Sequence, residues 1–188
     1  MLVALNQYLN ARAFSLRRPT QKYTMIISLI AAMSTNRAIG LNNKLPWPHI
    51  PADWANLERV TANKMMIMGR KSYDSPDRVW SKVGNVVVSR QSDYPLDAGF
   101  ELASSLPQAI EMVRGQAEVF ILGGEEIFRQ SMALADRIYL TLVHGIFEGD
   151  AFFPDIDHAV FGIATQTHHQ ADAQNPLDYS FVVYERRQ

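Results

Sequence analysis

The chain has 188 residues, 47% of them hydrophobic, which is enough to bury the core of one compact domain. Its formal net charge of −1 predicts no basic surface for nucleic acid, and its longest apolar run, residues 25–33, is far shorter than the ~20 residues of a membrane-spanning helix. The lack of cysteine excludes a disulfide framework, thiol catalysis and a cysteine zinc site, and it is typical of a cytoplasmic protein.

The first 24 residues differ from the rest because they carry basic residues and no acid. The basic residues are Arg12, Arg17, Arg18 and Lys22. Such a start resembles a transit peptide, but it also fits a start codon assigned too early or a loosely ordered appendage. Since Met25 stands directly before the first predicted strand, we expect residues 1–24 to be a dispensable basic extension and residues 25–188 to form the domain.

Eight apolar segments predict strands and four further segments predict helices. We expect strands over residues 26–33, 65–68, 84–90, 99–103, 117–122, 136–144, 159–168 and 178–186, and helices over 51–62, 70–75, 106–114 and 124–134. Strands that alternate with helices predict parallel crossovers, and the last two strands, with no helix between them, predict an antiparallel edge. The chain should therefore be an α/β, single-domain three-layer sandwich. Its central eight-stranded sheet should be mixed but mostly parallel, with four helices and an antiparallel C-terminal edge strand.

The helix predicted after Pro51 carries one carboxylate on its apolar side. Leu57 and Val60 follow Asp53 at i+4 and i+7, so the three side chains share one face. A carboxylate among apolar side chains has to be hydrogen-bonded, neutralised or paired with a ligand. An acid in the first turn of a helix also interacts favourably with the helix dipole, and that alone would account for Asp53.

The loop before this helix is apolar and restricted, whereas an ordinary connection is mostly polar. It contains Ile39, Gly40, Leu45, Pro46 and Trp47. Such a loop can close over a flat aromatic ligand while the helix behind it offers an anionic hydrogen-bond acceptor.

Two predicted strand ends carry basic and hydroxyl side chains. Residues 69–72, Gly-Arg-Lys-Ser, follow one strand and begin a helix, and Ser89 and Arg90 end the next strand. Free N–H groups and cationic side chains at such a place attract phosphate, although an isolated turn of this kind is more often only solvated. Gly123 and Gly124 lie between a third strand and a helix, where they allow the backbone to approach a ligand or simply form a turn. The ordinary G-x-G-x-x-G dinucleotide fingerprint is missing.

Taken together, these motifs resemble dihydrofolate reductase, and the resemblance runs from about Met25 to the C-terminus. In order along the chain they read AIG (38–40), LPW (45–47), PAD (51–53), IMGRKS (67–72), VVVSR (86–90), ILGGEEIF (121–128), YLT (139–141) and EGDAFFPD (148–155). The resemblance implies an eight-stranded sheet with four helices. It also implies a monomer that reduces 7,8-dihydrofolate to 5,6,7,8-tetrahydrofolate with NADPH, in one-carbon metabolism. Hydride would pass from the nicotinamide C4 to the pterin C6, and a proton would reach N5.

By this resemblance, Asp53 accepts hydrogen bonds from the pterin N3–H and 2-amino group, and the Thr141 hydroxyl supports the carboxylate. Burial should raise the pKa of Asp53 and make the rate depend on pH. Leu45 and Trp47 belong to the catalytic loop. The remaining substrate contacts implied are Ile30, Ala32, Trp54, Leu57, Pro76, Trp80 and Leu122.

The resemblance also assigns the NADPH site. Arg70, Lys71, Ser89 and Arg90 would surround the adenosine 2′-phosphate, and Ser72 would approach the pyrophosphate. The other cofactor contacts implied are Ala32, Ile39, Gly40, Gly69, Gly123, Gly124, Glu125, Glu126, Ile127 and Phe128. We expect both glutamates to face solvent, because they would repel a pyrophosphate. Asp150 matches the position that steadies the closed loop near Gly40.

Four positions depart from the family pattern. Leu57 replaces a phenylalanine, Phe128 replaces a tyrosine, and Pro76 replaces a branched aliphatic residue. The arginine that clamps the substrate's glutamate carboxylate falls on Val83, which places recognition of the tail in question more than the hydride chemistry.

Two other functions fit parts of the pattern. One is a related-fold NADPH reductase that acts on another pterin or on a pyrimidine intermediate of flavin synthesis, which the lack of an arginine at Val83 favours. The other is a non-catalytic nucleotide-binding module, against which the presence of both Asp53 and Thr141 argues. No metal site is expected from the five histidines, since no H-E-x-x-H motif occurs.

Overall fold

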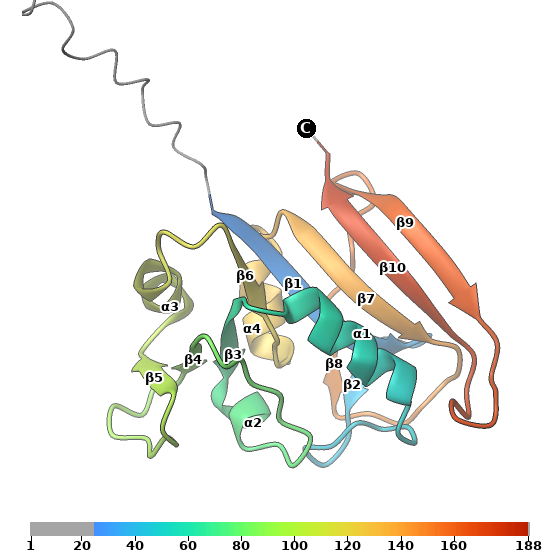
Figure 1. The fold of residues 1–188 in the computed structure, drawn as a ribbon, viewed down its shortest axis with the longest axis horizontal. Helices are drawn as coiled ribbons and strands as arrows, with labels where there is room; N and C mark the ends of the chain where they lie inside the picture. The colour runs from blue at the N-terminus through green and yellow to red at the C-terminus, as the bar shows by residue number, and fades with distance from the viewer. Residues whose placement is uncertain (1–24, 188) are drawn as a thin grey trace, which may run out of the picture.

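The computed structural model describes residues 25–187, so the expectations for residues 1–24 lie outside the described residues. One eight-stranded sheet has the strand order β5-β4-β3-β6-β1-β7-β10-β9 (Figure 1). In chain order its strands are β1 (Ile26–Ser34), β3 (Met65–Gly69), β4 (Asn85–Val88), β5 (Phe100–Ala103), β6 (Glu118–Ile121), β7 (Arg137–Val143), β9 (Phe161–His169) and β10 (Tyr179–Arg186). The predicted number of sheet strands is therefore confirmed.

The sheet is mostly parallel, as predicted. Strands β1, β3, β4, β5, β6 and β7 pair in parallel, whereas β10 is antiparallel to both β7 and β9. The antiparallel pairing expected of the last two strands is confirmed, with β9 as the outermost strand. Val119, Phe120 and Ile121 of β6 are completely buried, because this strand lies inside the sheet between β3 and β1 and helix α4 packs against it.

Helices lie on both sides of the sheet, which confirms the three-layer sandwich. They are α1 (Pro51–Thr61), α2 (Arg70–Tyr73), α3 (Leu106–Met112) and α4 (Glu125–Ser131). Helices α3 and α4 bury side chains in one core with Leu29 and Ile138. Figure 1 shows α1 on the opposite side, in front of β1 and β7, while α4 lies behind the sheet. Helix α4 ends at Ser131 instead of residue 134, where the chain turns toward β7.

A second, two-stranded sheet was not predicted from the sequence. It consists of β2 (Ala38–Gly40) and β8 (Ala151–Phe152), which are too short to show an alternating pattern. The Asp150 amide donates to the Gly40 carbonyl at 2.9 Å, and the Phe153 amide donates to the Arg37 carbonyl at 2.8 Å. This small sheet fixes the start of the 41–47 loop. None of the helices within residues 25–187 has the length and apolar character needed to cross a membrane.

Candidate active site

The candidate site lies where the parallel strands end. Because the carboxyl ends of parallel strands meet at one edge of a sheet, the segments that come after β1, β3, β4 and β6 in the chain lie near one another, and the segment after β1 reaches the 41–47 loop through β2. These segments are the 41–47 loop, the start of α2, Ser89 with Arg90, and the Gly123-Gly124 turn before α4. The cofactor contacts and the apolar loop before Asp53 were predicted from the sequence in these same segments.

Asp53 lies half-buried in the first turn of α1, as predicted. Burial raises the pKa of Asp53, while a hydrogen bond with the Thr141 side chain and the charge of His49 lower the pKa in part. Thr141 is 3% exposed and belongs to β7, next to Ala32 of β1. The structure therefore brings Asp53 and Thr141 together across the α1–sheet interface.

The start of α1 depends on a residue that the sequence reading missed. The N-cap residue of this helix is Ile50, whose side chain cannot cap the helix, and Pro51 follows with no N–H to satisfy. The Ala52 amide instead donates to Asn175 Oδ1 at 3.0 Å, although Asn175 is 123 residues away in the sequence. Asn175 is itself held by Asp172, whose carboxylate accepts its backbone and side-chain N–H groups. No local sequence signal near Asp53 points to Asn175.

His49 is the second residue that the sequence reading missed. Its ring centroid lies 5.6 Å from that of Trp54, and its charge acts on the carboxylate of Asp53. The side chain itself is exposed. A lone histidine in a loop gives no sequence signal that could have indicated its position near Trp54 and Asp53.

Apolar side chains pack around the start of α1, the helix that carries Asp53. Trp47 is buried in a cluster with Ile50, Val143 and Tyr179, and its ring meets that of Phe147 edge to face at 5.7 Å. Of the apolar residues predicted to contact the substrate or to belong to the catalytic loop, Ile30 is buried, and the half-buried ones are Ala32, Leu45, Trp54, Leu57 and Leu122. A carboxylate in such surroundings is poorly hydrated, which agrees with the upward direction of the pKa of Asp53.

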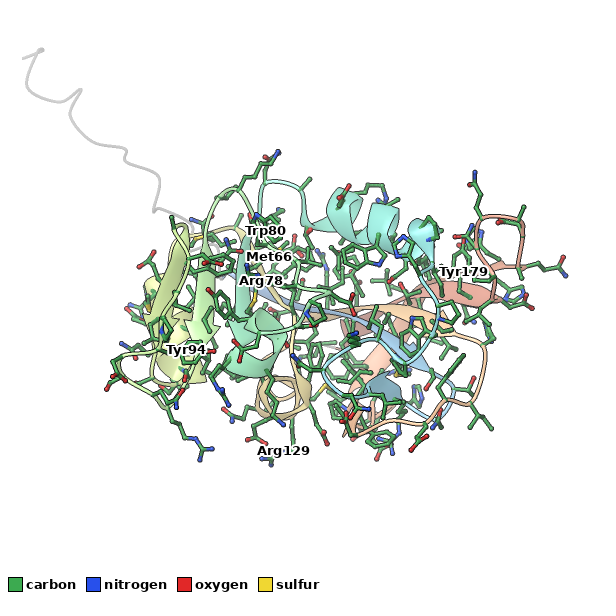
Figure 2. All side chains as sticks on the ribbon, turned by 90° about the horizontal axis from the view of Figure 1, so that it is seen from below. Met66, Arg78, Trp80, Tyr94, Arg129 and Tyr179 are labelled. Carbon is green, nitrogen blue, oxygen red and sulfur yellow. The ribbon has the colours of Figure 1, made fainter. Side chains whose placement is uncertain are left out.

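Pro76 and Trp80 have different surroundings from the other predicted substrate contacts. They line an open groove of about 380 Å³ with Tyr73, Asp74, Ser75 and Arg78. Trp80 is 57% exposed, and the Arg78 guanidinium lies 5.8 Å from the centroid of its ring. Figure 2 shows Arg78 and Trp80 close together on the side of the sheet that carries α1, with Arg129 of α4 on the other side. Pro76 and Trp80 therefore share an open groove whose lining residues do not include Asp53.

Val83, the position expected to hold a cationic clamp, is 49% exposed. The nearby guanidinium of Arg78 pairs with Asp97 at 2.8 Å and lies 4.4 Å from the centroid of the Tyr73 ring. Burial by itself lowers the pKa of Arg78, but the hydrogen bonds and charges of Asp97 and Tyr73 together outweigh it, so the pKa is raised overall. Arg78 is therefore already held by partners within the chain.

The glycines at the strand ends form a close backbone junction. The Gly69 amide donates to the Gly123 carbonyl at 2.5 Å, and the Gly123-Gly124 peptide bond is cis. A Cβ at Gly69 would lie 2.9 Å from Ile127 Cγ1, and one at Gly124 would lie 3.5 Å from Ser72 Oγ. The predicted cofactor residues 69–72 and 123–128 thus meet at one place, where Gly69 and Gly123 lack side chains and let the two backbone segments approach each other closely.

Replacing Gly123 with alanine is expected to destabilise this junction. Gly123 has φ +92°, and an added Cβ would lie 2.4 Å from Phe128 Cε2, with further ring atoms close behind. Because Phe128 is 2% exposed, its ring has little room to move. Thermal unfolding should show a loss of about 1–3 kcal/mol, and NADPH binding should weaken. Gly99→Ala is a matched control, since Gly99 also has positive φ but nothing within 4 Å of an added Cβ. A Gly123→Ala variant no less stable than this control would contradict the expectation.

The basic residues follow the strands that lead to this sheet edge. Arg70, Lys71 and Arg90 are exposed, and Arg70 pairs with Asp74 at 3.5 Å. Ser89 is buried, and its hydroxyl accepts a hydrogen bond from the Gln91 amide at 3.1 Å. Since β3 and β4 are neighbouring parallel strands, the residues that follow them lie at the same sheet edge.

Glu125 and Glu126 at the start of α4 are exposed, which confirms that they face solvent. Hydrogen bonds from Arg129 and then Gln130 lower the pKa of Glu126, and the charge of Arg90 adds to this lowering. Since β4 pairs in parallel with β3, Arg90 after β4 lies at the same sheet edge as the glycine junction.

Asp150 contacts the loop at the predicted place. Its amide donates to the Gly40 carbonyl at 2.9 Å, and its carboxylate accepts a hydrogen bond from the Asn42 amide at 2.9 Å. Ile39 and Gly40, both predicted cofactor contacts, are half-buried in β2 directly before this loop.

Comparisons with known proteins agree with this geometry. The profile of the dihydrofolate reductase family matches residues 26–186. A dihydrofolate reductase of Neisseria meningitidis serogroup A is 42% identical over 161 residues, covering 85% of this chain and 98% of the relative. One from Bacillus subtilis is 36% identical over 162 residues, covering 86% and 95%. A solved structure of dihydrofolate reductase from Enterococcus faecalis, complexed with NADP(H) and RAB-propyl, superimposes with a TM-score of 0.77 at 25% identity, covering 87% of this chain and 97% of that one. The chain belongs to the dihydrofolate reductase family.

Proposed function

We infer that this protein reduces 7,8-dihydrofolate to 5,6,7,8-tetrahydrofolate with NADPH. The observation that carries the inference is Asp53, a half-buried carboxylate with a raised pKa that is hydrogen-bonded to Thr141. It lies beside a loop of apolar residues at the sheet edge where the glycine junction is found. A carboxylate in this setting can accept hydrogen bonds from a flat, nitrogen-rich ring, and can favour protonation of that ring.

The described residues fit NADPH. A Cβ at Gly69 or Gly123 would clash with Ile127 or Phe128, so the close backbone junction needs glycine at both positions. Arg70, Lys71 and Arg90, at the same sheet edge, supply exposed positive charge. When bound, NADPH supplies the hydride for the pterin C6. The remaining proposed cofactor contacts are Ala32, Ile39, Gly40, Ser72, Ser89, Glu125, Glu126, Ile127 and Phe128.

The chain's own residues account for the other requirements of the reaction. Asp53 binds and orients the pterin, Thr141 fixes the carboxylate, and Leu45, Trp47, Ile30 and Leu57 exclude water around the reacting carbon. Asp53 also favours delivery of the proton to N5, either by relaying it or by polarising the ring. Trp54, Leu122, Pro76 and Trp80 complete the proposed substrate contacts.

The test is to measure NADPH oxidation with dihydrofolate and with a glutamate-free dihydropterin side by side. The proposal expects turnover of dihydrofolate. Activity confined to the glutamate-free pterin, or to a pyrimidine intermediate of flavin synthesis, would favour the related-fold reductase instead. NADPH binding without turnover of any of these substrates would favour a nucleotide-binding module.

Replacing Val83 with arginine is expected to tighten the interaction with the glutamate tail. An arginine at this exposed position would offer the tail a bidentate partner, which Arg78 cannot do while it pairs with Asp97. The KM for dihydrofolate should fall by the equivalent of about 1.5–3 kcal/mol, the scale of a charge-assisted hydrogen bond. Steady-state kinetics measure this, and the KM for a glutamate-free dihydropterin serves as the internal control, because it should not change.

An unchanged KM for dihydrofolate would mean that the tail lies elsewhere or that another cation already holds it. Lys82 is the neighbouring exposed cation. If Lys82→Ala then raises the KM of the parent enzyme sharply, Lys82 is that cation.

The remaining proposals concern the chain as a whole. We propose a cytoplasmic monomer that binds no nucleic acid, consistent with a net charge of −1 and the lack of cysteine. We also propose that residues 1–24 are dispensable for turnover by the domain over residues 25–188.

A further inference from the structure

The tip of the loop that precedes Leu45 is a small hairpin. Leu41 and Lys44 exchange backbone hydrogen bonds of 2.9 and 3.1 Å, and the two residues between them, Asn42 and Asn43, have φ values of 51° and 62°. Positive φ at both central residues is the pattern of a type I′ turn, which asparagine tolerates well. The tip therefore has its own internal bonds and can move as one unit.

Backbone groups on this tip are bound from two sides by residues far away in the sequence. On one side the Asn42 amide donates to the Asp150 carboxylate at 2.9 Å. On the other side the Ser75 hydroxyl donates to the Asn43 carbonyl at 3.0 Å, and the Leu45 amide donates to Asp77 Oδ2 at 3.2 Å. The loop is thus held between two carboxylates, that of Asp150 directly before β8 and that of Asp77 after α2.

Asp77 is on a well-fixed segment. Its amide donates to the Ser75 hydroxyl at 3.2 Å, and the Arg78 amide donates to the Ser75 carbonyl at 3.1 Å. The Arg78 side chain then anchors the segment, since it pairs with Asp97 and lies over the rings of Tyr73 and Phe100. A carboxylate held this way offers the loop an acceptor of fixed position and negative charge, which strengthens a hydrogen bond from an amide.

We propose that Asp77 is a positioning residue that holds Leu45 over the substrate by accepting the hydrogen bond from its amide. Leu45 is half-buried and packs with the cluster around Trp47, so the bond reaches the proposed catalytic loop directly. This proposal rests on the function inferred above, because Leu45 matters for turnover only if the loop covers the pterin. Without Asp77 the tip keeps its hairpin and its bond to Asp150, but its far side is held by Ser75 alone.

The experiment compares Asp77→Ala, Asp77→Asn and Asp93→Ala. Asp93 is an exposed acid and serves as the matched control. In single-turnover measurements with NADPH and its C4-deuterated form, Asp77→Ala should slow hydride transfer by about tenfold, the scale of one charge-assisted hydrogen bond. Asp77→Asn should recover most of the rate, because its amide oxygen still accepts the Leu45 N–H. The melting temperature should match that of Asp93→Ala.

Hydrogen exchange in peptides that cover residues 41–47 gives a second measurement that does not require turnover. Asp77→Ala should speed exchange there, and Asp93→Ala should not. Unchanged exchange and an unchanged hydride-transfer rate in Asp77→Ala would overturn the proposal, as would equal losses in Asp77→Ala and Asp77→Asn with a lower melting temperature. A parent enzyme that fails to reduce dihydrofolate would refute the inferred function, whereas the exchange result would still decide whether Asp77 holds the loop.

Discussion

Replacing Asp53 with asparagine is expected to remove most dihydrofolate reduction near neutral pH while leaving NADPH binding nearly intact. Asparagine keeps the size of the side chain but cannot carry the negative charge that favours a protonated pterin. General acid–base assistance contributes about 10²–10⁴-fold to rates, so a loss in this range is expected. Thr141 would lose its carboxylate partner, although it could still hydrogen-bond to the new amide. The glycine junction and the basic residues that bind NADPH lie at other strand ends and are not changed.

The same substitution should raise the stability of the protein. The pKa of Asp53 is raised above its ordinary value of 3.8, so the folded state holds the proton more tightly than the unfolded state does. The stability linked to Asp53 is therefore fully present below pH 3.8 and is lost as the pH rises through the folded pKa. At pH values above the folded pKa the ionised carboxylate is a cost that asparagine removes, and the melting temperature there should rise by about 2–4 °C for each kcal/mol relieved.

The measurements are turnover and melting temperature across a pH series, with Glu58→Gln as the control. Glu58 belongs to the same helix but is exposed, so neither turnover nor its pH profile should change in this variant. An Asp53→Asn enzyme with parental activity and an unchanged pH profile would refute the role of Asp53. A lower melting temperature of Asp53→Asn at neutral pH would show that the partners of Asp53 stabilise its carboxylate by more than burial destabilises it.

Local patterns in the sequence were sufficient to predict where several residues of the proposed site lie in the fold. Asp53 shares a helix face with Leu57 because side chains four residues apart lie on one side of a helix, so its direction follows from spacing alone. The cofactor residues could be grouped because the ends of parallel strands meet at one edge. Both inferences use regular geometry that extends over a few residues or along a strand.

What the sequence did not predict depends on contacts between distant segments. Asn175 satisfies the Ala52 amide from 123 residues away, and β2 and β8 pair through only two or three residues each. Asp77 likewise contacts Leu45 through a loop whose shape no periodicity describes. Arg78 is a further example. Its position in the sequence, close to Val83, allows an interaction with the substrate tail, but in the structure its guanidinium pairs with Asp97.

Neutralising Arg70 and Arg90 together is expected to weaken NADPH strongly and NADH only slightly. The two residues follow neighbouring parallel strands, and both are exposed beside the glycine junction. NADPH differs from NADH by the 2′-phosphate, and guanidinium groups bind such an anion through charge-assisted hydrogen bonds of about 1.5–3 kcal/mol each. Arg70→Gln and Arg90→Gln together should therefore raise the KM for NADPH by at least about tenfold. The fold should survive, since the exposed Arg70–Asp74 pair is worth only about 0.2–1 kcal/mol.

The comparison needs KM values for both cofactors, measured at two salt concentrations. Arg114→Gln is the matched control, because Arg114 is an exposed arginine that follows α3 and pairs with Glu111. If Arg70 and Arg90 bind the 2′-phosphate, the preference for NADPH over NADH should decrease in the double variant and stay unchanged in the Arg114→Gln control. The salt dependence of the NADPH KM should also become shallower, since added salt weakens the attraction between these exposed cations and the phosphate. If the KM rises equally for both cofactors, Arg70 and Arg90 contact a part of the molecule that NADPH and NADH share. Selection of the 2′-phosphate would then have to come from Lys71 or Ser89.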